Sequence, residues 1–340
     1  MAAILTAGRR TVANRLRTLR HLAPGHPTDY CRVLSRAPWS GLQLSALLTR
    51  FLLDHLVPTG PVMLVGDDTV DGHPGAKVYG HARHRDPVRS SHSYTAWRYG
   101  HKWVVLVVLV PLPWATRPWA LPILVDLDRS PVLDANEQRR HRTPAQCMAR
   151  LLRVSIRQFP DRVGRYGGGQ RSVATLDGTG HWYKAGQELV PIRWVFVRDL
   201  TGTHRDEYSF TTDLTFTVEA VIAAYCGRWN IETTFQEARS CLGLETTRGW
   251  CRKTVLRAAP CLFGLYSVVA ILFHALPESK RTGAIVWPGK TGVTFSDALC
   301  AVRRWLWAET ILPQAGDSTA LDKLSASVRE LLLTTLAPAA

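Results

Sequence analysis

The stretch PVMLVGDDT, residues 61–69, joins a short apolar run to two consecutive aspartates, Asp67 and Asp68. A run of this length that ends in polar residues is typical of a strand buried in a sheet, with the carboxylates at its carboxyl end. Because side chains alternate between the two faces of a strand, Thr69 shares a face with Asp67. Asp68 points to the other face unless the strand has already ended. The stretch therefore predicts a sheet with a carboxylate-bearing strand end.

Two further strands and a helix are predicted downstream of this strand. HKWVVLVVLVP (101–111) and WALPILVDL (119–127) are apolar runs joined by a proline-rich turn, which is typical of neighbouring strands. The basic stretch HARHRDPVRSSH (81–92), which precedes them, is expected to form a loop. TPAQCMARLLRVSIRQF (143–159) has helical periodicity, with threonine as the N-cap and proline at the first helical position.

The remaining segments predict helices at both ends of the chain and a second group of strands between them. The N-terminal region is basic, and its apolar residues recur at helical spacing. Beyond the helix that starts at Thr143, the sequence predicts three short strands, at 171–178, 190–199 and 206–213. A long helix capped by Thr217 follows, and then an apolar helix and two C-terminal helices, predicted at 258–276, 296–308 and 321–336.

We therefore expect an α/β fold that is organised in four parts. These are a basic helical N-terminal region (1–57), the first part of a sheet-based core (58–162), a β-rich insertion (163–214) and a C-terminal part that begins with the long helix (215–340).

Composition indicates a globular protein with an anionic partner. Hydrophobic residues make up 46% of the chain, and 42 Lys and Arg exceed 27 Asp and Glu to give a net charge of +15. Such an excess favours a polyanion, and nucleic acid is the commonest one. The apolar segment 258–276 contains Pro260 and His274 and is short for a membrane span, so we expect a core helix and no membrane. The seven cysteines include no CxxC pair, which favours a reducing, cytoplasmic location.

The helix that contains YCGRWNIETTFQEARSCLGL (225–244) has an unusual polar face. Tyr225, Arg228, Glu232 and Arg239 are three, four and seven residues apart, so they lie along one side of the helix. A plain Arg228–Glu232 ion pair, worth only a few tenths of a kcal/mol (about 0.2–0.5), would explain two of them. The opposite flank has its own apolar set, namely Ile231, Phe235, Ala238 and Leu242. The polar face is therefore free to meet the aspartate strand, and two facing carboxylates are what a divalent metal needs.

The spacing of this face resembles the Y-(2)-R-(3)-E-(6)-K motif of bacterial insertion-sequence DDE transposases, a branch of the DDE superfamily endonucleases. Arg239 stands at the Lys position, which keeps the charge and alters the geometry. Asp67 and Thr69 match the Asp-x-Thr that ends the first strand in the same family. The order of predicted elements agrees over most of the chain. The resemblance implies a ribonuclease-H-like mixed sheet with flanking helices, a β-rich insertion and a helical N-terminal segment.

In function, the resemblance implies cut-and-paste transposition of double-stranded DNA. Family members cleave transposon ends and transfer them to target DNA with Mg²⁺, for which Mn²⁺ substitutes, and they work as a homodimer in the synaptic complex. On this basis Asp67 and Glu232 are the predicted catalytic metal ligands. The predicted DNA contacts are Tyr225, Arg228 and Arg239. The predicted supporting side chains are Asp68, Thr69 and Trp229.

One feature of the family is missing from the sequence. The second catalytic aspartate should end a strand that follows the helix at 143–159, and PDRVGRYGGG stands there instead. Asp126, Asp161 and Asp177 are the nearest candidates, and none has the right position. We infer an internal deletion after Arg162 that leaves the core incomplete and puts activity in doubt. The alternatives are a non-catalytic DNA-binding transposase remnant and another metal-dependent nuclease.

Overall fold

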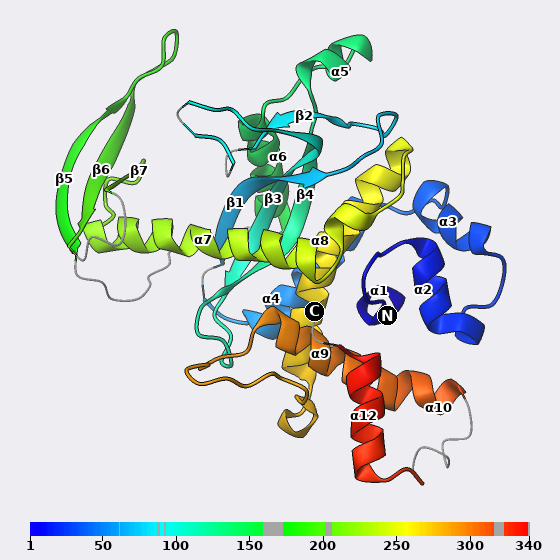
Figure 1. The fold of residues 1–340 in the computed structure, drawn as a ribbon. Helices are drawn as coiled ribbons and strands as arrows, with labels where there is room; N and C mark the ends of the chain where they lie inside the picture. Colours follow the sequence, from blue (N-terminus) through cyan, green and yellow to red (C-terminus); the bar gives the residue numbers. More distant parts are fainter. Residues whose placement is uncertain are drawn as a thin grey trace.

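The computed structural model describes residues 1–60, 62–86, 89–91, 93–158, 173–200, 206–315 and 323–338. A four-stranded antiparallel sheet forms its centre (Figure 1), built from β1 (Met63–Gly72), β2 (Ala82–Arg85), β3 (Trp97–Val110) and β4 (Trp119–Asp128). β3 is the central strand, because β1 pairs with one of its edges and β4 and β2 pair with the other. The mixed α/β class with helices around the sheet is as predicted and fits a ribonuclease-H-like fold.

Helices cover both faces of this sheet. The N-terminal region folds into short helices, α1 (Ala2–Leu5), α2 (Val12–Leu19), η1 (Arg20–Leu22) and α3 (Pro27–Ser35), followed by α4 (Gly41–Leu56). In the sequence, α5 (Pro131–Asn136) and α6 (Pro144–Gln158) follow β4. The C-terminal part contains α7 (Val218–Ser240), η2 (Leu244–Thr246), α8 (Arg252–Ala275), η3 (Glu278–Lys280), α9 (Phe295–Leu306), η4 (Trp307–Ile311), α10 (Leu312–Ala315) and α12 (Ala326–Leu336).

The apolar run of β3 enters two separate cores. Its even-numbered residues from Val104 to Val110 pack in one core with side chains of α4, α6, α8 and α9. Its odd-numbered residues from Trp103 to Leu109 pack in another with side chains of α7 and α8. A strand buried on both faces has no polar side to present, which explains why the sequence is apolar without alternation.

β1 is an edge strand in the part of the chain that the structure describes, where it pairs only with β3. Its residues Met63, Leu64 and Val65 are half-buried. The predicted loss of an aspartate-bearing strand falls on residues 159–172, which include Asp161 and Arg162 and lie outside the described residues. The described residues therefore place no strand beside the second edge of β1.

Four sequence-based expectations need correction. The stretch 81–92 is not wholly a loop, because Ala82–Arg85 pairs with the start of β3 as β2. The apolar helix begins at Arg252 rather than at 258, since its first turns are polar, and Pro260 lies inside it. The helix predicted at 296–308 gives way to a π-helical turn at Trp307, and the last described helix begins at Ala326 rather than at 321.

α8 is the one described helix that is long and apolar enough to cross a membrane by length and composition. Half of its most apolar window is buried inside the protein. Tyr266, Val269 and Phe273 of this helix belong to the core on the α9 side of the sheet, and Phe263 belongs to the core on the α7 side. α8 thus serves as a core helix that joins the two cores.

The β-rich insertion forms its own three-stranded antiparallel sheet near the N-terminal end of α7 (Figure 1). Its strands are β5 (Val173–Trp182), β6 (Val190–Asp199) and β7 (Glu207–Thr211). One face packs toward α7 and buries Val195. The register of the strands places mainly apolar and aromatic side chains on the other face, together with the exposed Arg198. Most of the apolar and aromatic side chains are exposed as well, among them Leu176, Trp182, Val190, Tyr208 and Phe210.

Candidate metal- and DNA-binding site

Asp67 lies on the face of β1 that meets α7. β1 continues to Gly72, so the strand has not ended at the aspartate pair and its side chains still alternate. Asp67 is paired in register with Val105, which packs in the core lined by α7. α7 begins at the predicted N-cap, where the Thr217 hydroxyl accepts a hydrogen bond from the Ala220 N–H. The polar face of this helix is thereby held over the aspartate.

Arg228 of α7 joins the two predicted metal ligands. Its Nη1 lies 2.7 Å from Oδ2 of Asp67 and 3.3 Å from Oε1 of Glu232. The i, i+4 ion pair expected from the sequence is present, but the guanidinium also bridges to a strand 161 residues away. The three side chains are partly open to solvent, with 28% of Asp67, 33% of Arg228 and 43% of Glu232 exposed.

The pKa of the Glu232 carboxyl is shifted upward, chiefly by partial burial. Partial burial raises the pKa of the Glu232 carboxyl, and the nearby Asp67 charge raises it further, whereas Arg228 acts in the opposite direction. Two carboxylates brought together in this way repel each other, and a cation between them offsets the repulsion. Arg228 supplies that positive charge here.

Arg239, the last position of the motif, reaches the same strand two residues further on. Its Nη1 donates to the Thr69 hydroxyl at 2.8 Å, and Thr69 is buried. Burial lowers the pKa of the Arg239 guanidinium, and the charge of Glu245 partly offsets that effect. Thr69 therefore binds Arg239 two residues along the strand from Asp67, and among the described contacts it makes none to the aspartate side chain.

Two aromatic side chains flank Arg228 on α7. The guanidinium carbon lies 4.9 Å from the ring centre of Trp229 and 5.6 Å from that of Tyr225. Trp229 is exposed, and Tyr225 also lines a cleft between β7 and α7. The predicted residues Tyr225, Arg228 and Glu232 thus stand together over Asp67, with Trp229 at the rim.

The other acidic residues considered from the sequence lie elsewhere. Asp68 faces the opposite side of the sheet, 3.2 Å from Lys102 Nζ, so the structure does not bring it to the site. Asp126 accepts a hydrogen bond from Arg150 at 2.9 Å, and Asp177 pairs with Arg193 at 2.6 Å. Asp161 is outside the described residues.

Asp67 and Glu232 fit one divalent cation and not two. Mg²⁺ is commonly held by one or two carboxylates, with water and substrate phosphate oxygens completing its shell. Within the described ranges, no group of three or more His, Cys, Asp or Glu residues could hold a metal ion. A two-ion centre needs more ligands than these two carboxylates.

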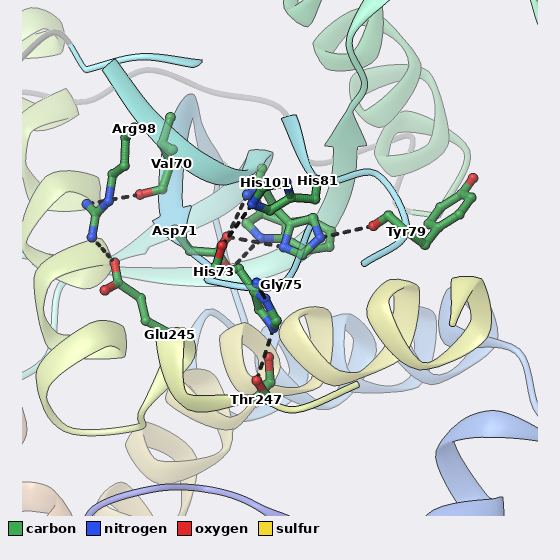
Figure 2. Close-up of polar contacts among 11 residues, drawn as sticks. Val70, Asp71, His73, Gly75, Tyr79, His81, Arg98, His101, Glu245 and Thr247 are labelled. Carbon is green, nitrogen blue, oxygen red and sulfur yellow. Dashed lines mark hydrogen bonds and ion pairs between the residues drawn. The ribbon is translucent and has the colours of Figure 1, made fainter. Parts of the chain in front are cut away.

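Sequence reasoning missed a buried polar network at the end of β1 (Figure 2). Asp71 is only 2% exposed and accepts hydrogen bonds from the His101 backbone N–H at 3.0 Å and from Trp103 Nε1 at 3.1 Å. The ring of His101 extends the network to the Tyr79 carbonyl at 3.0 Å. Asp71 continues the alternation of Asp67 and Thr69, and this spacing was the signal available in the sequence.

The same region ties β1 to the segment that follows α7. His73 Nε2 lies 3.1 Å from the Thr247 carbonyl, and Arg98 Nη2 forms a 2.7 Å ion pair with Glu245 (Figure 2). At the C-terminal end of α7, the buried Arg10 donates to the Cys241 carbonyl at 2.5 Å. These contacts fix where α7 leaves the sheet and so hold its polar face over Asp67.

Comparison with known proteins agrees with this architecture. The model of the DDE superfamily endonuclease family matches residues 1–179, and the chain belongs to that family. The match includes Asp67 and ends within β5, before α7 and Glu232. Comparison with curated proteins gives no match. Membership implies a DNA substrate and the divalent-metal chemistry that is general in the family.

Replacing Asp71 should destabilise the protein far more than replacing its neighbour Asp68. Asp71→Ala leaves two buried N–H donors without an acceptor, and each costs about 1–3 kcal/mol, so we expect the free energy of unfolding to fall by about 3 kcal/mol. Asp68→Ala removes only a surface ion pair and should cost less than about 1 kcal/mol. Urea denaturation of both variants measures the difference, and equal losses would contradict the role assigned to Asp71.

Mild acid should weaken the fold through the buried His73 and the half-buried His84. Burial lowers the pKa of His73, and burial together with Lys102 lowers the pKa of His84 to about 4. As pH falls, these histidines are therefore protonated in the unfolded chain before they are protonated in the folded protein. Their contribution to the free energy of unfolding is complete above about pH 6.5 and is lost as pH falls toward 4. His84→Gln should remove part of this pH dependence, on the order of 2 kcal/mol, in denaturation series between pH 7 and pH 4. A slope unchanged by the substitution would count against this explanation.

Arg228 should compete with divalent cations for the two carboxylates. Arg228→Gln removes the resident charge, and we expect Mn²⁺ affinity in the absence of DNA to rise roughly tenfold, equivalent to about 1.4 kcal/mol. Arg239→Gln is the matched control, because that side chain contacts Thr69 and neither carboxylate. Titration followed by electron paramagnetic resonance of free Mn²⁺ gives both affinities. An unchanged or lower affinity in Arg228→Gln would refute the competition.

Proposed function

We propose that the chain is a DDE-type transposase of the insertion-sequence branch with the Y-(2)-R-(3)-E-(6)-K motif. The observation that carries the proposal is the meeting of Asp67 and Glu232 at the Arg228 guanidinium. Arg239 and Tyr225 stand on the same helix face, and family membership supports DNA as the substrate. The reaction is metal-dependent strand cleavage at the ends of the element, followed by strand transfer to target DNA.

On this proposal each side chain has a defined task. Asp67 and Glu232 hold Mg²⁺ or Mn²⁺, which when bound would activate the attacking oxygen and stabilise the charge on the scissile phosphate. Arg228 exchanges its carboxylate partners for a DNA phosphate, since a guanidinium binds either in the same geometry. Arg239 contributes a second cation for the backbone, and the exposed ring of Trp229 offers a surface for a base.

The partners follow from the same family relationship. The net charge of +15 favours double-stranded DNA and predicts binding that weakens as salt rises. We propose that two copies act together on a pair of transposon ends, in the cytoplasm.

A second candidate function is a DNA-binding remnant that does not cleave. Within the described residues only two carboxylates meet at the site, and β1 pairs on one edge alone. Both observations favour an internally shortened core that lacks the second catalytic aspartate. Such a protein would still recognise transposon ends and would compete there with an intact transposase.

Assays on the end DNA of the element separate the two functions. The transposase proposal predicts Mg²⁺- or Mn²⁺-dependent nicking at the ends, with at least about a hundredfold loss in Glu232→Ala and in Asp67→Ala because each removes a metal ligand. Binding should remain within a few fold in both variants, since neither residue supplies positive charge. Glu219→Ala, which alters an exposed carboxylate at the start of the same helix, is the control and should retain nicking.

Each outcome decides between the proposals. Salt-sensitive binding of end DNA without nicking supports the remnant and excludes the enzyme. Nicking at random positions, abolished by Glu232→Ala, supports a metal-dependent nuclease of another kind. No affinity for DNA at moderate salt defeats all three.

A further inference from the structure

The hairpin formed by β2 and the start of β3 presents two arginines and two aromatic rings on one open face. Arg83 is paired in register with Tyr99, and Arg85 with Trp97. Trp97 is 50% exposed and Tyr99 58% exposed, although both rings are large enough to fill a core position. The guanidinium carbon of Arg83 lies 4.2 Å from the ring centre of Trp97.

Stabilisation of the hairpin explains only part of this arrangement. Cross-strand pairs and a cation over a ring each contribute about 0.2–1 kcal/mol in such a position. They do not require both aromatic residues to remain half open to water. In the part of the chain that is described, neither Arg83 nor Arg85 forms an ion pair, so the charge on this face is uncompensated.

This face continues the side of the sheet that carries Asp67. Asp67 is paired with Val105 and Asp71 with His101, so these two β3 residues share the face of the aspartates. Alternation along the strand places Tyr99 on that same face. Six residues separate Tyr99 from Val105, which corresponds to about 20 Å of strand at ~3.4 Å per residue. A single DNA molecule can therefore reach both places.

We propose that Trp97 and Tyr99, with Arg83 and Arg85, form a second nucleic-acid site that takes unpaired bases of single-stranded DNA. The aromatic rings stack on bases, and the guanidinium groups neutralise the phosphates beside them. A duplex keeps its base faces stacked inside the helix, so this surface discriminates in favour of a separated strand. The inference rests on the proposed DNA function for the identity of its ligand.

Fluorescence anisotropy with the full chain tests the site. The probes are a dye-labelled oligothymidine and a duplex of the same length. The Trp97→Ala/Tyr99→Ala double variant should bind the single strand at least about tenfold more weakly, since each base stacked on a ring contributes substantially to affinity. Its affinity for the duplex should stay within about twofold, and Trp97→Phe/Tyr99→Phe should recover most of the single-strand affinity because the rings are restored.

Trp287→Ala is the matched control. Trp287 is also 50% exposed and lies beside a cation, with Lys290 Nζ 4.3 Å from its ring centre. That variant should bind both probes as the unaltered chain does, and thermal unfolding should confirm that all variants are folded.

The possible results distinguish the two proposals. Unchanged single-strand affinity in the double alanine variant overturns the second site, as does an equal loss with duplex or with Trp287→Ala. If the unaltered chain binds only the duplex, the second site fails and the proposed function stands. If it binds neither probe, both fail.

Discussion

The double burial of β3 is the constraint on which the rest of the structure depends. A strand that is apolar on both faces requires a covering layer on each side, and here helices supply both layers and bury Val104 and Val105 together. α7 supplies one layer, α4, α6 and α9 supply the other, and α8 contributes side chains to both. Because β1 is paired with β3 residue by residue, the same constraint decides which way each side chain of β1 faces. Asp67 is directed at α7 and Asp68 at the opposite layer for this reason alone.

Local periodicity was enough to predict from the sequence which side chains share a face of β1 and of α7. Alternation in residues 61–69 separates Asp67 and Thr69 from Asp68, and the structure has that arrangement. Helical spacing placed Tyr225, Arg228 and Glu232 on one face, and the apolar residues of the opposite flank are buried. In long elements with a strong apolar pattern, the periodicity itself indicates the secondary structure and the buried face, so one sequence is enough to find them.

Contacts between segments that are distant in the sequence could not be predicted from local periodicity. Arg228 has an obvious partner four residues away, and nothing local indicates that Asp67 shares it. The network around Asp71 depends on the register of β1 against β3, which places His101 and Trp103 beside the carboxylate. β2 is only four residues long and has no apolar periodicity, so it exists because β3 extends far enough to pair with it. In each case long-range packing, not local propensity, decides the outcome.

The exposed, largely apolar face that the described residues of the β5–β6–β7 sheet present has a consequence for the behaviour of the protein in bulk solution. A patch that contains Trp182, Tyr208 and Phe210 favours association with the same patch on another copy of the protein at short range. The charge of +15 repels other copies at longer range, and the repulsion is screened within about 10 Å at 0.1 M salt. Colloidal stability is then a balance between these two forces. Added salt, or a polyanion that cancels the charge, shifts that balance toward condensation.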